Sequence, residues 1–265
     1  MEQKGGFNRD AFRNLFEAEE KSFWFTNRNR LIVHYLKKYF PDMESYLEIG
    51  CGTGFVLKAV HEAFPRCGVS GSELFEEGLV YARERVSDAN LIQLDAMNMT
   101  ASGQYDCFGA FDVLEHIQDD EKVMKNLCAS LSCNGQTGGR GGVITVPQHM
   151  FMWSAEDDYA CHVRRYSQKE LRTKLEGAGF KVIRMTGFVS LLFPFMMASR
   201  LLKKRKNVPI GGEDMAGAHA GDELHLPSWL NAMFSAVMKI EFLLIRFGVS
   251  FPFGGSILAV VKKKD

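Results

Sequence analysis

The glycine-rich segment at residues 46–54 constrains the fold more than any other part of the chain. Its sequence, YLEIGCGTG, runs from a short apolar stretch directly into Gly50, Gly52 and Gly54. Glycine lets the backbone turn sharply and approach a ligand closely at the start of a following helix. The segment therefore predicts a strand, a ligand-binding loop and a helix in succession, as in nucleotide-binding α/β folds.

Short apolar runs alternate with helical patterns from this segment onward. The runs that predict strands are YLEIG, GVSGSE, NLIQLD, YDCFGAFDVL, GGVITVP, FKVIRMTGF and SILAVVKKK. Strands separated by helices predict a mostly parallel sheet that is covered on both faces. The expected fold class is therefore α/β, with a doubly wound, mostly parallel, seven-stranded sheet.

The remaining segments predict appendages to a single core, since 265 residues allow one large α/β domain but not two. We expect an N-terminal helical cap at 1–41, a cofactor-binding α/β domain at 42–187, a helical insertion or lid at 188–253, and the final strand at 254–265. Residues 148–166 have no clear period and predict a long functional loop. The insertion contains a Pro-interrupted apolar piece, the basic run KKRK at 203–206, a Gly-rich loop at 211–221 and an amphipathic helix at 227–247.

Charge and cysteine usage bear on partners and location. Thirty-two basic and thirty-two acidic residues give no net charge, which disfavours nucleic acid as a partner. The six scattered cysteines include no C-x-x-C pair, so a reducing, cytoplasmic location is expected. The N-terminus is charged and the longest apolar stretch, 188–198, is too short to span a bilayer. No membrane anchor is expected, although residues 188–206 could contact a membrane surface.

Acidic residues follow several of the predicted strands. Glu73 ends the second strand about twenty residues after the glycines, where doubly wound folds use a carboxylate to bind a ribose diol. Asp95 ends the third strand, and Phe111 and Asp112 end the fourth. Ligands of such sheets bind outside the carboxyl ends of the strands. The third glycine comes one residue too early for G-x-G-x-x-G, which argues against a nicotinamide or flavin site.

The combined motifs resemble the class I S-adenosylmethionine-dependent methyltransferases. In detail they are similar to a bacterial branch with LEIGCGTG, FDVLEH, and VPQH followed by H-x-R-R-Y, and the resemblance extends from WFTNRNR to FGGSILAV. It implies the Rossmann-like methyltransferase fold and S-adenosyl-L-methionine as cofactor, released as S-adenosyl-L-homocysteine. The sequence departs from the pattern at Ser72, before the acid of the second strand, and in the lengthened loop NGQTGGRGG.

The resemblance also assigns roles to individual residues. It implies that the glycine loop holds the methionine part of the cofactor, that Glu73 binds the ribose, and that Asp95 and Ala96 lie at the adenine. Phe111 would supply a backbone carbonyl, and Arg28 looks like the arginine that some relatives use for the cofactor carboxylate. The full expected cofactor set is Arg28, Glu48, Gly50, Cys51, Gly52, Gly54, Glu73, Leu74, Asp95, Ala96, Phe111 and Asp112.

Three residues are candidates for removing a proton from a methyl acceptor: His162, His116 and Tyr166. The alternative is structural, with His116 capping a helix and the H-x-R-R-Y segment locking its loop by hydrogen bonds. No pair of residues has metal-ligand spacing, so no metal is expected. The residues after the fourth strand lack the N/D-P-P-Y/F signature that resembling enzymes use for base or glutamine amines, which favours a small-molecule or lipid-linked acceptor.

Two other functions stay open from the sequence alone. One is an NAD-dependent oxidoreductase, and the other is a catalytically silent regulatory protein that binds the cofactor without turnover. We further expect the insertion to form the roof of the acceptor site, because a strand parallel to the first five ends at the edge where the cofactor would lie.

Overall fold

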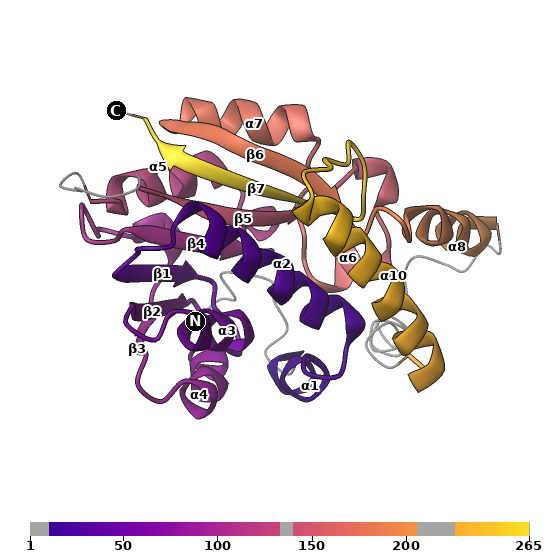
Figure 1. The fold of residues 1–265 in the computed structure, drawn as a ribbon, viewed down its shortest axis with the longest axis horizontal. Coiled ribbons are helices and arrows are strands. Elements are labelled where there is room, and N and C mark those ends of the chain that lie inside the picture. The colour runs from indigo at the N-terminus through magenta and orange to yellow at the C-terminus, as the bar shows by residue number, and fades with distance from the viewer. Residues whose placement is uncertain (1–10, 133–139, 206–225, 265) are drawn as a thin grey trace.

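The computed structural model describes residues 11–132, 140–205 and 226–264, and within them the predicted seven-stranded sheet is confirmed (Figure 1). The strand order is β3-β2-β1-β4-β5-β7-β6. All strands are parallel except β7, which lies antiparallel between β5 and β6. The strands are β1 (Ser45–Ile49), β2 (Gly68–Glu73), β3 (Asn90–Gln93), β4 (Cys107–Phe111), β5 (Gly141–Pro147), β6 (Phe180–Phe188) and β7 (Ser256–Lys263).

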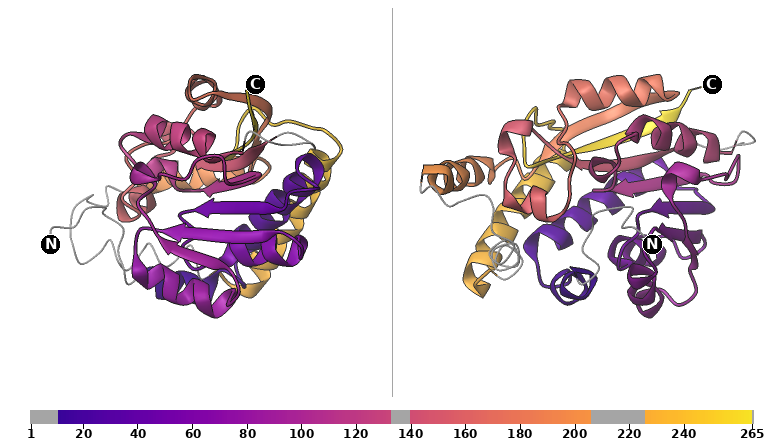
Figure 2. Two further views of the ribbon diagram at one scale, coloured as in Figure 1. Left: turned by 90° about the vertical axis from the view of Figure 1, so that its left-hand side faces the viewer. Right: turned by 180° about the vertical axis from the view of Figure 1, so that it is seen from behind.

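Helices cover both faces of the sheet (Figure 2). One face packs against α2 (Phe23–Tyr39), α3 (Phe55–Ala63) and α10 (Ser228–Arg246), where Tyr46 and Leu258 join the apolar core of these helices. The opposite face packs against α5 (Asp120–Ser130) and α7 (Gln168–Gly177), around Phe108 and Ile144. Helix α4 (Glu76–Arg85) packs on β2 and β3, and α1 (Ala11–Ala18) packs on α4. This alternation of buried apolar residues on the two faces explains the continuous hydrophobic runs of the strands.

The carboxyl edge of the sheet gathers the ends of the parallel strands and the start of β7. Ser256, which begins β7, pairs with both Pro147 at the end of β5 and Phe188 at the end of β6. The insertion between β6 and β7 therefore leaves and returns at the carboxyl edge. Figure 1 shows its helices α8 (Phe193–Arg205) and α10 on that side of the molecule.

Helix α10 runs parallel to α2 and is attached to it along its length. The Asn231 amide oxygen accepts from the Phe23 backbone N–H at 2.8 Å, and Asn27 donates to the Ser235 hydroxyl at 3.3 Å. Nearer the other end, the rings of His34 and Phe242 meet edge to face. By length and composition α10 is apolar enough to cross a membrane, with a mean hydropathy of 1.3.

Two expectations for irregular segments need correction. Residues 148–166 are not all loop, since they contain the 3₁₀ turn η3 (Met150–Met152) and the short helix α6 (Ala155–Tyr159), which begins with a capping box at Ser154. Pro194 does not break the apolar piece, because it lies in the first turn of α8, where no intrahelical N–H partner is needed. The Gly-rich loop predicted at 211–221 and most of the lengthened loop before β5 lie outside the described residues.

Candidate active site

The glycine loop joins β1 to α3 at the carboxyl edge, and its backbone requires glycine. Gly50, Gly52 and Gly54 all have positive φ, of 60°, 53° and 77°, which side chains rarely adopt. A Cβ on Gly54 would lie 2.9 Å from the Ala82 Cα, so this glycine lets α3 and α4 pack closely. A Cβ on Gly52 would meet nothing within 4 Å. Gly52 is therefore the point at which the loop backbone is open to a ligand.

Glu73, at the end of β2, fastens this loop to the neighbouring strand. Its Oε2 accepts from the Gly52 N–H at 3.0 Å, and its Oε1 accepts from the Leu74 and Phe75 N–H groups at 2.8 and 3.2 Å. Burial raises the pKa of this carboxyl, against the lowering effect of the three backbone donors. A carboxylate offers about four acceptor positions, so one on Oε2 is left for a ligand hydroxyl.

The N-terminal helices close over the glycine loop. The Thr53 hydroxyl donates to the Glu19 carboxylate at 2.6 Å, and Arg85 pairs with the same carboxylate and also donates to the Thr53 hydroxyl at 2.6 Å. Glu19 and Arg85 are both buried. This triad ties the end of α1, the loop and α4 together, and it could not be predicted because the three residues are far apart in the chain.

Arg28 extends from α2 to the end of β4. Its guanidinium pairs with the Asp112 carboxylate and lies 4.5 Å from the centre of the Trp24 ring. Asp112 has a positive φ of 56°, an unusual conformation for a residue other than glycine. Two residues that the resemblance placed at the cofactor are thus brought together, and the Nε of Arg28 is buried without a partner.

Glu48, two residues before Gly50, is buried under α2. Burial raises the pKa of its carboxyl to about 8, opposed by a hydrogen bond from the Tyr46 hydroxyl and by the charge of Arg28. The Tyr46 hydroxyl lies 3.2 Å from its Oε2. A neutral, buried carboxyl beside the loop is a group whose charge state a cationic ligand would change.

The remaining expected cofactor residues also line the carboxyl edge. Cys51 is buried, and its N–H donates to the Ser72 carbonyl. Asp95 caps the 3₁₀ turn η1 (Ala96–Asn98) by accepting from the Met97 N–H at 2.9 Å, so its side chain has the structural role of a cap. Phe111 is buried at the end of β4, and Leu74 is partly exposed.

His162 is held in a fixed orientation by a buried carboxylate. Its Nδ1 lies 2.8 Å from the Asp157 Oδ1, and Asp157 is also bound by the Arg165 guanidinium at 2.7 and 2.9 Å. Although burial opposes it, these donors lower the pKa of Asp157 well below its usual range. An ionised Asp157 fixes Nδ1 as the protonated nitrogen of His162 and leaves Nε2 as the proton acceptor.

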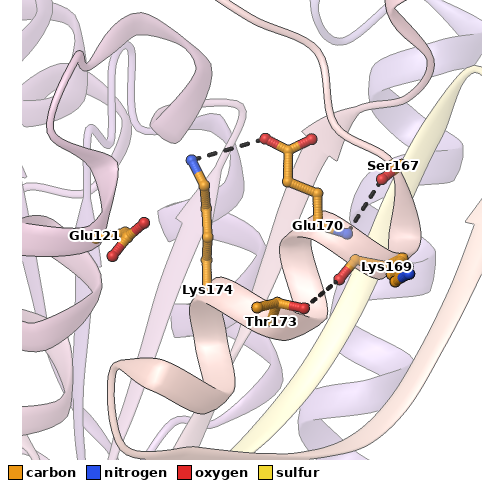
Figure 3. A pocket seen from close by; sticks show the side chains of 6 residues that line it. All are labelled: Glu121, Ser167, Lys169, Glu170, Thr173 and Lys174. Carbon is orange, nitrogen blue, oxygen red and sulfur yellow. Dashed lines mark hydrogen bonds and ion pairs between the residues drawn. The ribbon is translucent and has the colours of Figure 1, made fainter.

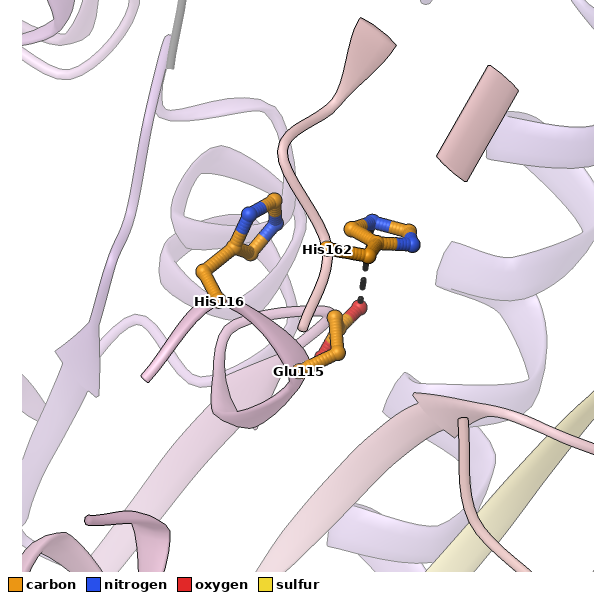
Figure 4. Close-up of side chains that lie close together, drawn as sticks. All are labelled: Glu115, His116 and His162. Atoms are coloured by element: carbon orange, nitrogen blue, oxygen red, sulfur yellow. Dashed lines mark ion pairs between the residues drawn. The ribbon is translucent and has the colours of Figure 1, made fainter. Parts of the chain in front are cut away.

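Glu115 and His116 lie beside His162 at the end of β4 (Figure 4). Both oxygens of Glu115 are buried without a hydrogen-bond partner, and Oε1 lies 4.0 Å from the His162 Nε2. Burial, and next the charge of Asp112, raises the pKa of Glu115 well above its usual value. Burial and the neighbouring His162 lower the pKa of His116 to about 4. Ligand atoms of the three residues lie within 4.8 Å of one another, a spacing that could hold a metal ion.

Tyr166 has a structural position. It is fully buried, and its hydroxyl donates to the Asp120 carboxylate at 2.6 Å. Lys174 also binds Asp120, and the negative charge together with burial raises the pKa of Tyr166 far above its usual value. The hydroxyl of Tyr166 is therefore engaged in a buried hydrogen bond, which favours a structural role, and its expected part in removing a proton stays a prediction.

The positions of Asp157 and Glu115 beside His162 were not predicted from the sequence. Asp157 stands in the run AEDDY, where nothing separates it from its acidic neighbours, and only the fold shows that it faces His162 and Arg165. Glu115 lies within FDVLEH, but its burial depends on the turn η2 (Leu114–His116).

A separate hollow between α5 and α7 is lined by exposed polar residues and includes no predicted site residue (Figure 3).

Comparison with known proteins identifies the family to which the chain belongs. Residues 16–185 match the model of a family described as a methyltransferase domain. The chain belongs to this methyltransferase family. A curated relative, a malonyl-[acyl-carrier protein] O-methyltransferase of Anoxybacillus flavithermus, is 32% identical over 73 residues, which cover 27% of this chain and 28% of the relative. An isoflavone 4'-O-methyltransferase of Medicago truncatula is 27% identical over 167 residues, covering 51% of this chain and 43% of the relative.

Solved methyltransferase structures share the fold. Phosphoethanolamine N-methyltransferase 2 of Haemonchus contortus, in complex with S-adenosyl-L-methionine, is 16% identical with a TM-score of 0.57, over 90% of this chain and 53% of that one. A methyltransferase of Thermotoga maritima is 14% identical with a TM-score of 0.56, over 96% and 95% of the two chains. This chain thus spans less than half the length of the curated relatives and about half of the Haemonchus contortus enzyme.

Proposed function

We propose that this methyltransferase transfers the methyl group of S-adenosyl-L-methionine to a small-molecule or lipid-linked acceptor. The observation that carries the proposal is the glycine loop, which is open at Gly52 and held by the Glu73 carboxylate at the carboxyl edge of the sheet. Ligands of doubly wound folds bind at this edge.

The residues present fit this cofactor. Glu73 has an acceptor position left for a ribose hydroxyl, and the Gly52 backbone leaves room for close approach. Arg28 and Glu48 supply a buried cation and a titratable carboxyl beside the loop, which suit the carboxylate and ammonium of a methionine moiety. Asp95 and Ala96 lie at the end of the next strand, on the side where the adenine would follow the ribose.

Bound S-adenosyl-L-methionine supplies an activated methyl group on a sulfonium. With the cofactor held by Glu73, Arg28 and Glu48, an acceptor lone pair would bond to this methyl group as the carbon–sulfur bond breaks and leaves its electron pair on the sulfur. The residues of this chain mainly position the acceptor and exclude water. An acceptor hydroxyl or ammonium also has to lose a proton, and His162 Nε2, with Nδ1 fixed by Asp157, is placed to take it.

The acceptor enters, in this proposal, beneath the insertion. Helix α10 packs on α2, which carries Arg28, while the loop that carries His162 follows β5. The two segments form opposite walls at the carboxyl edge. Relatives support a small acceptor, since their names describe methylation of isoflavones and of an acyl carried on a protein.

Calorimetric titration of the purified chain tests the cofactor assignment. We expect saturable binding of S-adenosyl-L-homocysteine at one site and no binding of NAD. Binding of NAD, or no binding of S-adenosyl-L-homocysteine, would contradict the assignment. Release of S-adenosyl-L-homocysteine upon addition of an acceptor then separates an enzyme from a protein that binds the cofactor without turnover.

A further inference from the structure

A surface helix normally exposes polar side chains and buries apolar ones, but α10 exposes many apolar side chains. Its exposed side is apolar over its whole length: Trp229 is 70% exposed, Ile240 55% and the adjoining Phe247 84%, and Met233, Leu243 and Leu244 lie on the same side. At 100° per residue these six side chains fall within one stripe about 100° wide. Its only acidic residue, Glu241, is turned inward and accepts from the Ser190 and Leu191 N–H groups at 2.7 Å.

Other exposed apolar side chains lie on segments at the carboxyl edge, including the start of α8. Phe193, at the start of α8, contacts the rings of His149, Phe151 and Phe253. Phe151 and Phe253 are themselves exposed, as is Phe195 one turn into α8. A soluble monomer rarely presents so large an apolar surface to water, and such patches mark contact sites for proteins or membranes.

The charges around this surface favour a lipid partner with anionic headgroups. Lys239 and Arg246 are exposed along one flank of the apolar stripe, and no exposed acid occurs on α10. The sequence of α8, FPFMMASRLLKKR, likewise contains basic residues and no acid. An apolar face flanked by basic residues is the pattern of helices that lie in the interface of an anionic bilayer.

We propose that α10, together with the start of α8, docks this protein on the surface of an anionic phospholipid bilayer. The helix lies in the plane of the interface, because its inner side is occupied by Asn231, Phe234 and Phe242 in contact with α2, and by buried Glu241. At 1.5 Å per residue its stripe is about 28 Å long. Both helices belong to the insertion that leaves and returns at the carboxyl edge, so docking would bring that edge near the membrane and let a lipid-linked acceptor reach the site; only this last step rests on the proposed function.

Vesicle flotation of the full chain tests the surface directly. We expect binding to phosphatidylcholine vesicles that contain phosphatidylglycerol, weaker binding to phosphatidylcholine alone, and a decrease with rising salt. Replacement of Lys239 and Arg246 by Glu should weaken binding to the anionic vesicles about tenfold. Replacement of Ile240, Leu243 and Phe247 by Gln should lower it by a similar or larger factor, because the apolar contact is lost.

The matched control is Val80→Gln on α4, since Val80 is 56% exposed and thus comparable with Ile240; it should bind vesicles like the unchanged chain. Affinity for S-adenosyl-L-homocysteine, measured on the same preparations, should be the same in all variants. This measurement distinguishes a failure of the cofactor assignment from a failure of the membrane proposal. The proposal is overturned if the unchanged chain does not float with the anionic vesicles. It is also overturned if the Ile240/Leu243/Phe247 variant floats as well as the unchanged chain. A third contrary result would be a dimer of the unchanged chain, detected by light scattering, that the Ile240/Leu243/Phe247 variant abolishes while neither protein binds vesicles.

Discussion

Single backbone positions decide whether the glycine loop can hold a ligand. Gly52 and Gly103 both have positive φ, of 53° and 64°, and a Cβ on either would meet nothing within 4 Å. Replacement of either by Ala therefore imposes similar backbone strain, of about 1 kcal/mol. We expect Gly52→Ala alone to weaken binding of S-adenosyl-L-homocysteine in calorimetry. Equal loss in Gly103→Ala would show that general destabilisation is the cause.

Glu73 has two functions that a mutation can separate. Glu73→Ala should weaken cofactor binding by about 1.5–3 kcal/mol, because a charge-assisted acceptor is lost. It should also lower the melting temperature of the free protein, since the Gly52, Leu74 and Phe75 N–H groups lose their shared acceptor. Calorimetry with thermal unfolding checks both effects, and unchanged cofactor affinity would mean that Glu73 only fastens the loop.

Glu48 predicts a pH dependence of stability. Its folded-state pKa of about 8 lies above the ordinary 4.5, so its contribution is full below about pH 4.5 and is lost as the pH rises towards 8. Over that window the unfolding free energy of the unchanged chain should fall relative to Glu48→Gln by up to about 1.4 kcal/mol per pH unit. Urea denaturation at several pH values measures this difference, and parallel curves for the two proteins would contradict the assignment.

At the scale of elements, the segment after β5 carries His162, the proposed proton acceptor. His162→Gln should lower kcat by about 10²–10⁴ with an acceptor that must lose a proton, while cofactor affinity is kept. Asp157→Asn should act through His162, shifting the acid limb of the pH–rate profile. His61→Gln serves as the control, because His61 is a half-buried histidine on α3 that pairs with Asp88 and is not among the expected site residues. An unchanged kcat in His162→Gln would exclude this base.

The strands and most helices were predictable from sequence because apolar periodicity reports burial locally. GGVITVP matches β5 residue for residue. The helix α6 was missed, since AEDDY is too short and too polar to show a period. The site was predictable at the glycines and Glu73, whose spacing is fixed by the βαβ unit. The pairing of His162 with Asp157 depends on how a long segment turns back, which no local pattern records.

For the whole molecule, the insertion changes what the common fold presents at its carboxyl edge. The amphipathic helix expected at 227–247 corresponds to α10, which contacts α2 on one side and leaves an apolar stripe on the other. The expected membrane contact at 188–206 covers only the smaller part of this surface. The larger part lies on α10, where the fold determines which apolar side chains are exposed and which are buried.

The antiparallel strand β7 also sets an order of assembly. It lies between β5 and β6, so β6 has no hydrogen-bonded neighbour in the sheet until β7 has inserted. During synthesis the edge of β5 is thus open while α8 and α10 are made, and the sheet is completed only afterwards. A chain that ends before residue 256 would lose β7, and β6 would then have no strand to pair with. The edge of β5 would stay unpaired, and unpaired edges of this kind promote aggregation.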